Sequence, residues 1–169
     1  MIKPGEKLPK ATVFELVEDE SEGCTVGPIS FDVLEQTAGK RVVIFGLPGA
    51  FTPTCSGKHV PGYVEHAAAL RAAGIDEIWC VSVNDAFVMG AWARDQGTSG
   101  KVRMMADGSA AFTRALGLEQ DLSARGMGIR SQRYAMVVDD GVVKTLNVEA
   151  PGKFEVSDAA SILATLTQS

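Results

Sequence analysis

The apolar run Val42-Val43-Ile44-Phe45-Gly46-Leu47 is followed directly by the stretch Pro48-Gly49-Ala50-Phe51-Thr52-Pro53-Thr54-Cys55. A continuous apolar run of this length is typical of a buried β-strand. Thr52 is a good helix N-cap, and Pro53 suits the first helical position, where its missing N–H costs no hydrogen bond. The pattern therefore predicts a strand, a tight loop and a helix whose first turn contains Cys55.

A cysteine in the first turn of a helix faces unpaired backbone N–H groups and the positive end of the helix dipole. Both favour the thiolate, which is the nucleophilic form of cysteine. The alternative is a buried cysteine that packs as a small apolar side chain. The capping pattern around Cys55 favours the reactive sulfur.

Composition indicates one soluble domain over residues 1–169. The chain is 46% hydrophobic and 22% charged, which is ordinary for a globular protein. Its net charge of −5 argues against a nucleic-acid partner, because no basic excess is available to neutralise phosphates. No run approaches the roughly 18 apolar residues of a membrane span, so no membrane association is expected.

The three cysteines, Cys24, Cys55 and Cys80, do not suggest a disulfide framework because their number is odd. The N-terminal residues 1–5 lack the apolar core of a signal peptide. We therefore expect a cytoplasmic location, where cysteines stay reduced. Cys24 follows a polar turn and is expected to be exposed and incidental.

Apolar periodicity and turn signals predict an α/β fold, with a mixed central sheet and helices on both of its faces. Pro61-Gly62 is expected to kink or divide the helix that contains Cys55, and Asp139-Asp140-Gly141 is a strong hairpin turn. The predicted strands are 12–17, 41–47, 77–83, 102–106, 133–138 and 142–148. The predicted helices are 30–39, capped by Ser30, then 53–74, 85–95, 109–117, capped by Ser109, and a last one capped by Ser157. Residues 118–131 are predicted to form a loop or an irregular helix.

Two kinds of cysteine chemistry can be weighed at Cys55. Dithiol exchange uses Cys-x-x-Cys, but Thr52 and Lys58 stand at the partner positions, which excludes it at this motif. A cysteine hydrolase needs a histidine and an orienting group. His59 could share the helical face of Cys55, but it has no evident third member, so we interpret it as a helix-surface histidine and keep the hydrolase as an alternative.

Peroxide reduction remains. A thiolate attacks one peroxide oxygen and becomes a sulfenic acid, and the transition state needs fixed donors around both sulfur and oxygen. Thr52 can hold the incoming oxygen, and Pro48 can shield the site from water. An arginine suits the required cation because it stays charged. The residues alone leave three candidates for it: Arg125, Arg130 and Arg133.

The spacing Pro48-x-x-x-Thr52-x-x-Cys55 resembles the active-site motif of the peroxiredoxins, and the longer run 48–56 is similar to their type II/type V branch, which is atypical and linked to glutaredoxin. Further matching runs are 83–89, 106–109 and 133–141. The resemblance implies a thioredoxin-like fold with an N-terminal strand extension. It also implies reduction of hydrogen peroxide and alkyl hydroperoxides without metal or flavin cofactor.

Site roles follow from the same resemblance. It implies that Cys55 is the peroxidatic cysteine, that Thr52 orients the peroxide, that Pro48 shields the pocket and that Arg133 stabilises the thiolate. A homodimer is also implied, with Phe51 and Phe87 either near the subunit contact or packed in the core.

Cys80 resembles the second cysteine of plant-like type II members and is a candidate resolving cysteine. Its place in a predicted central strand puts it about 10 Å below Cys55 at roughly 3.3 Å per residue, too far for a disulfide without local unfolding. We therefore expect a packed Cys80 and a one-cysteine cycle that is completed by glutathione with glutaredoxin or by thioredoxin. A thiol-based redox sensor without catalytic turnover is the alternative function.

Overall fold

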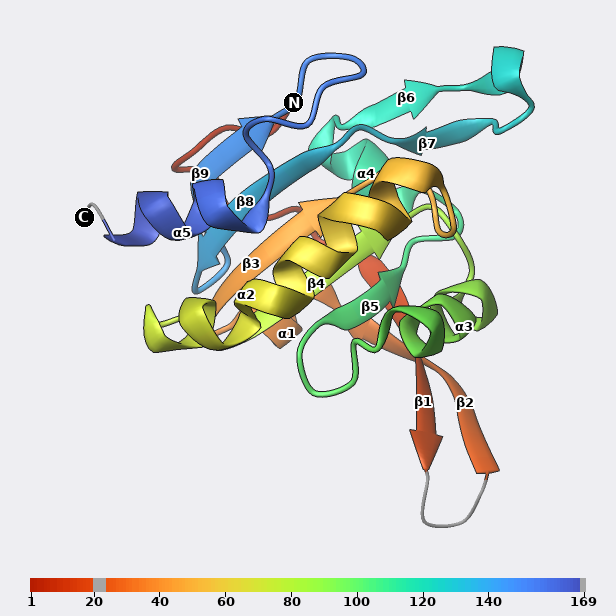
Figure 1. The fold of residues 1–169 in the computed structure, drawn as a ribbon, viewed down its shortest axis with the longest axis horizontal. Coiled ribbons are helices and arrows are strands. Elements are labelled where there is room, and N and C mark those ends of the chain that lie inside the picture. The colour runs from red at the N-terminus through yellow and green to blue at the C-terminus, as the bar shows by residue number, and fades with distance from the viewer. Residues whose placement is uncertain (20–23, 168–169) are drawn as a thin grey trace.

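The computed structural model describes residues 1–19 and 24–167, and a mixed seven-stranded sheet forms its centre (Figure 1). The strand order is β2-β1-β5-β4-β3-β8-β9. The inner strands β3, β4 and β5 are parallel, and β8 and β1 add to them in the antiparallel sense. The strands are β1 (Thr12–Asp19), β2 (Cys24–Asp32), β3 (Arg41–Gly46), β4 (Glu77–Ser82), β5 (Arg103–Ala106), β8 (Tyr134–Asp139) and β9 (Val142–Val148).

Helices cover both faces of this sheet, as the sequence predicts (Figure 1). The helices α2 (Val60–Ala72), α3 (Ala86–Gln96) and α5 (Ala159–Thr167) pack on one face, and α1 (Val33–Thr37) and α4 (Ala111–Leu116) pack on the other. Alternate residues of each inner strand enter the two cores, because successive side chains of a strand point to opposite faces. Phe45 thus meets α2, whereas its neighbour Ile44 lies in the other core.

The N-terminal region differs from the prediction in one element. The predicted strand 12–17 is present as β1, but Ser30 lies in a second strand, β2, which pairs antiparallel with β1. Helix α1 therefore starts later, at the N-cap Asp32, whose carboxylate accepts the N–H groups of Leu34 and Glu35. The predicted polar turn starts at Asp19, which is instead the last residue of β1. The rest of that turn, residues 20–23, and the predicted exposure of the Cys24 side chain lie outside the described part of the chain.

Residues 118–131, predicted as a loop or an irregular helix, contain a small hairpin. Its strands are β6 (Glu119–Asp121) and β7 (Ile129–Ser131), and the short 3₁₀ helix Ser123–Arg125 lies between them. These strands are too short to produce a periodic pattern.

Two predicted helix caps are wrong because a neighbouring carboxylate is the better acceptor. Asp107, rather than Ser109, accepts the first N–H groups of α4. Asp158, rather than Ser157, accepts the N–H of Ser161 in α5. Within the described residues, no helix combines the length and the apolar character that crossing a bilayer would require.

Candidate functional site

Cys55 lies where the sequence predicts, in the first turn of the helical segment that begins at Pro53 after β3. The segment Cys55–His59 is a π-helical turn, in which the N–H of Val60 binds the carbonyl oxygen of Cys55. The helix is not divided at Pro61-Gly62, because α2 continues through both residues; the change from π to α geometry comes earlier, at Val60. Single π turns are frequent at functional sites. This one was not predicted, because the π geometry has no sequence signature comparable to a cap.

One of the three candidate arginines contacts the sulfur. Arg133, immediately before β8, donates from Nη2 to the Sγ atom of Cys55 at 3.2 Å. Arg130 instead donates to the carbonyl oxygens of Met127 and Pro48. The remaining candidate, Arg125, is exposed at the end of the 3₁₀ helix. The residue that the family resemblance indicated is therefore the one that the fold brings to Cys55.

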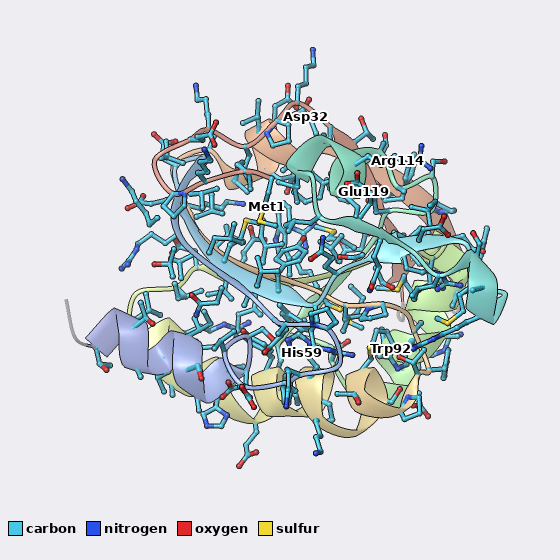
Figure 2. The ribbon with its side chains drawn as sticks, turned by 90° about the horizontal axis from the view of Figure 1, so that it is seen from above. Met1, Asp32, His59, Trp92, Arg114 and Glu119 are labelled. Atoms are coloured by element: carbon cyan, nitrogen blue, oxygen red, sulfur yellow. The ribbon has the colours of Figure 1, made fainter. Side chains whose placement is uncertain are left out.

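His59 is completely buried, so its interpretation as a helix-surface histidine is wrong. Arg133 donates from Nη1 to His59 Nδ1 at 2.9 Å. That contact makes Nδ1 an acceptor, so the proton is on Nε2, which donates to the carbonyl oxygen of Ser157 at 3.1 Å. Burial, reinforced by the charge of Arg133, lowers the pKa of His59 to about 3. The ring is therefore neutral at physiological pH (Figure 2 shows His59 beside α2).

The segment 149–157 closes the site from the other side. The ring of Phe154 lies 5.9 Å from the guanidinium carbon of Arg133 and meets His59 edge-on at 5.0 Å between centroids. The fold of this segment depends on Glu149, whose carboxylate accepts the N–H groups of Glu155, Val156 and Ser157 and the Ser157 hydroxyl. Burial disfavours the charged form, but these hydrogen bonds outweigh it and lower the pKa of Glu149.

Sequence reasoning missed the roles of His59, Phe154 and Glu149. The spacing of four residues between Cys55 and His59 was a usable signal, because it places both on one helical face. Phe154 and Glu149 gave no comparable signal, since their contacts depend on the path of an irregular segment.

Pro48 and Thr52 line the mouth of the site. With Arg133 they border a cleft of about 870 Å³, and Cys55 lies buried next to them. The Thr52 hydroxyl donates to the carbonyl oxygen of Gly49 at 2.7 Å, a contact within the loop rather than a helix cap. Its oxygen keeps lone pairs that can accept a hydrogen bond from a substrate.

Cys80 is fully buried and unpaired, in register with Phe45 of β3 and in the same core as Cys55. Burial, followed by the proximity of Cys55, raises the pKa of the Cys80 thiol well above its ordinary value. Cys80 is therefore a protonated core thiol in this structure, which makes it a poor nucleophile.

This arrangement can hold a negatively charged sulfur beside a fixed cation. It does not suit a cysteine hydrolase, because both ring nitrogens of His59 are engaged by Arg133 and Ser157. His59 has no free nitrogen with which to take a proton from Cys55, so the hydrolase alternative lacks its base.

Known proteins match nearly the whole of this chain. The Redoxin family model matches residues 3–163. Peroxiredoxin-2E, chloroplastic, of Arabidopsis thaliana is 49% identical over 98% of this chain and 69% of its own length. Peroxiredoxin-2C of the same organism is 46% identical over 98% of both chains.

Solved structures agree in fold. Reduced Prx3 of Vibrio vulnificus in complex with H₂O₂ is 54% identical, with a TM-score of 0.90 over 98% of this chain and 99% of its own. A Burkholderia cenocepacia protein, named as a proposed thioredoxin reductase, is 79% identical, with a TM-score of 0.94 over 98% of both chains.

The buried neutral His59 predicts a specific loss of stability in mild acid. Unfolding restores an ordinary histidine pKa of about 6.5, so below that pH the unfolded chain binds one more proton than the native protein. His59 should therefore lower the free energy of unfolding by about 2 kcal/mol between pH 7.5 and pH 5, a window above its folded pKa of about 3. Urea unfolding at the two pH values measures this difference.

The matched variants are His59→Gln and His66→Gln, which each remove one of the two histidines. His59→Gln should reduce the pH difference by about 2 kcal/mol, whatever its effect on stability at pH 7.5, and His66→Gln should keep the wild-type difference. An unchanged slope in His59→Gln would contradict the buried neutral ring.

Proposed function

Because this chain belongs to the peroxiredoxin family, in its type II/type V branch of the thioredoxin-like superfamily, and is therefore a thiol-dependent peroxidase, we propose that Cys55 is the sulfur that reduces the peroxide. The observation that carries the proposal is the 3.2 Å contact between Arg133 Nη2 and Cys55 Sγ. A charged donor at that distance stabilises a thiolate and, later, the charge that spreads onto oxygen.

The first step is attack by the Cys55 thiolate on one oxygen of hydrogen peroxide or an alkyl hydroperoxide. A sulfur–oxygen bond forms, the oxygen–oxygen bond breaks, and the second oxygen leaves with the bonding electrons and is protonated as water or alcohol. Cys55 is left as a sulfenic acid. Thr52 accepts a hydrogen bond from the peroxide, and Pro48 keeps bulk water away from it. No metal or flavin takes part in this step.

Arg133 acts from a fixed position because its guanidinium has three neighbours. Its Nη1 binds the neutral His59, its Nη2 binds Cys55, and the ring of Phe154 lies over it. A guanidinium held in this way loses no further side-chain freedom when the transition state forms. His59 and Phe154 are therefore positioning residues for the cation.

The second step restores Cys55. We expect an external thiol, glutathione with glutaredoxin or thioredoxin, to attack the sulfenic acid in a one-cysteine cycle. The protonated, buried state of Cys80 supports this choice, because a resolving cysteine must reach the sulfur as a thiolate. A reducing cytoplasm would supply such thiols and is the proposed location, although some relatives carry the names of organelles.

Two other functions are less well supported. A redox sensor without turnover would have no use for the fixed Arg133 and the substrate cleft beside Cys55. The name of the Burkholderia structure suggests a reductase, but the three cysteines of this chain lie at 24, 55 and 80, so it contains no Cys-x-x-Cys pair for dithiol chemistry.

Removal of the cation should slow the first step. Arg133→Gln is expected to lower the second-order rate constant for Cys55 oxidation about 100- to 1000-fold, as for other donors to a developing anion. Arg133→Lys should recover only part of the rate, because it keeps the charge but not the fork that binds His59 and Cys55 together. Tryptophan fluorescence can follow the reaction, since the indole of Trp92, which Figure 2 labels, donates to Ser56 Oγ at 3.0 Å, and Ser56 follows Cys55 in the chain.

Arg125→Gln is the control, because Arg125 lines the cleft but does not contact the sulfur. It should change the rate of Cys55 oxidation by no more than about twofold, as expected for an exposed charge. An Arg133→Gln protein that is oxidised at the wild-type rate would remove the basis of the proposal.

The one-cysteine cycle predicts that Cys80 is dispensable. Cys80→Ser protein should turn over peroxide at the wild-type rate with glutathione and glutaredoxin, and intact-mass analysis after one equivalent of peroxide should show a sulfenic acid or a glutathione adduct on Cys55. Cys80→Ala separates the loss of the thiol from the cost of a buried hydroxyl. Loss of turnover in both variants, with the fold intact, would make Cys80 the resolving cysteine.

A homodimer is the proposed assembly. Phe51 and Phe87, which flank the motif loops, are 54% and 64% exposed, so the core-packing alternative for them is wrong. Exposed aromatic side chains of this kind are typical of an interface. Sedimentation equilibrium should give the mass of a dimer for the wild type and a smaller mass for Phe87→Glu, whose charge would be buried in the contact. A monomeric wild type would contradict this assembly.

A further inference from the structure

The loop between β3 and the Cys55 turn contains a strained residue. Phe51 has a φ of 63°, in the left-handed region that a bulky side chain rarely adopts. A backbone conformation of this kind is retained only where neighbouring contacts enforce it, and such residues gather at functional sites. The Phe51 side chain is more than half exposed, so its own packing adds little to that constraint. The conformation is therefore held mainly through the backbone around it.

Asn84 binds the backbone next to the strained residue. Its Oδ1 atom accepts the N–H of Ala50 at 3.0 Å. The same oxygen accepts the hydroxyl of Ser82 at 2.6 Å, so both of its lone pairs are used. Ser82 is fully buried at the end of β4, and its carbonyl oxygen accepts the N–H of Asp107. The amide of Asn84 is therefore fixed to the sheet on one side and holds the loop on the other.

Strand pairing places Asn84 beside this loop. Because β3 and β4 are parallel, their carboxyl ends lie at the same edge of the sheet. Their pairing continues to the N–H of Leu47, which donates to the carbonyl oxygen of Val81 at 3.3 Å. The loop that follows Leu47 and the turn that follows Ser82 are therefore neighbours, and Asn84 lies in that turn, before α3 begins.

The contacts inside the loop do not attach it to the sheet. The hydroxyl and the N–H of Thr52 both donate to the carbonyl oxygen of Gly49, at 2.7 and 3.4 Å. From outside the loop, Arg130 donates to the carbonyl oxygen of Pro48 at 3.4 Å, which is longer than an ordinary N–H···O bond. The hydrogen bond to Asn84 is shorter and begins at the residue before the strained one. It is therefore well placed to determine where the Thr52 hydroxyl lies.

We infer that Asn84 is a positioning residue for the peroxide. It holds the loop in the strained conformation in which Thr52 lines the cleft beside Cys55. The inference rests on the proposed function, because Thr52 is the residue that accepts a hydrogen bond from the peroxide. Asn84 thus differs from Arg133, which contacts the sulfur itself. Loss of the Asn84 side chain should misplace the peroxide without changing the ionisation of Cys55.

The first measurement is the pH profile of the rate constant for Cys55 oxidation by hydrogen peroxide. In Asn84→Ala the alkaline plateau of this profile should fall about tenfold, within the range for a small misplacement of a bound reactant. The midpoint of the profile should not move. Arg133→Gln should instead raise the midpoint, because it removes the cation that stabilises the thiolate. Simple destabilisation of the fold would change neither quantity in the folded protein.

A paired variant separates the loop contact from the cost of a buried, unpaired hydroxyl. Asn84→Ala alone leaves the Ser82 hydroxyl without its acceptor, whereas Ser82→Ala/Asn84→Ala removes both partners and should be more stable. The plateau of the double variant should nevertheless be as low as that of Asn84→Ala, because both proteins lack the contact with Ala50. The double variant also serves as the test protein where Asn84→Ala folds poorly.

Asp32→Ala is the control for stability. It removes the N-cap of α1, which packs on the other face of the sheet, and Figure 2 shows Asp32 and His59 well apart. Loss of the cap should lower the free energy of unfolding and leave the pH profile of Cys55 oxidation as in the wild type.

Phe51→Gly tests the link to the strained backbone. Glycine adopts a positive φ without steric cost, so the loop should depend less on Asn84. In the Phe51→Gly background, Asn84→Ala should lower the plateau by no more than about twofold, because the two sites are coupled through the same loop. Both proteins in this comparison carry Phe51→Gly, so any effect of that change on a dimer contact cancels.

A wild-type profile in Asn84→Ala, or a shifted midpoint, would overturn the inference. So would recovery of the rate in Ser82→Ala/Asn84→Ala, an equal loss of rate in Asp32→Ala, or an undiminished loss in the Phe51→Gly background. The proposed function would stand in each case, because peroxide would still oxidise Cys55 in the wild type and Arg133→Gln would still slow that reaction. Failure of peroxide to oxidise Cys55 in the wild type would overturn both.

Discussion

The contact between the guanidinium of Arg133 and the sulfur of Cys55 is the interaction on which the site depends. It joins the start of a helix to the start of β8, 78 residues later in the chain. These segments meet because β3 pairs with β8 along its length, which brings Gly46 opposite Tyr134. The residues that follow Gly46 lead to Cys55, and the residue that precedes Tyr134 is Arg133. The register of one strand pair therefore sets the distance between cation and sulfur.

The features that could be predicted from the sequence are the ones with strong local signals. The strand β3, the helix start at Pro53 and the hairpin of β8 and β9 all carry strong local signals, and they place Cys55 and Thr52 correctly. The arginine could not be chosen from its neighbours alone, because Arg125, Arg130 and Arg133 lie within nine residues. Resemblance to a family selected Arg133, and the strand register shows why this arginine reaches the sulfur.

The features that were missed depend on long-range contacts. Strand β2 lies at the edge of the sheet with no buried residue over 27–32, and β6 and β7 have three residues each, so the periodicity of all three is weak. Burial of His59 requires the segment 149–157 to pass over it, and that path is set by the hydrogen bonds of Glu149 to three successive N–H groups. A charged residue after a strand does not by itself indicate that it will order the following loop.

A neutral histidine is well suited to hold the cation of such a site. Arg133 needs an acceptor for the N–H groups that do not face Cys55, because an unpaired buried donor is costly. A carboxylate at the position of His59 would satisfy them, but it would also neutralise the guanidinium and repel a thiolate. His59 accepts the same hydrogen bond without a negative charge, and its low pKa keeps it from adding a second cation. The nearby carboxylate of Glu149 is directed to backbone N–H groups instead, which leaves the charge of Arg133 to the sulfur.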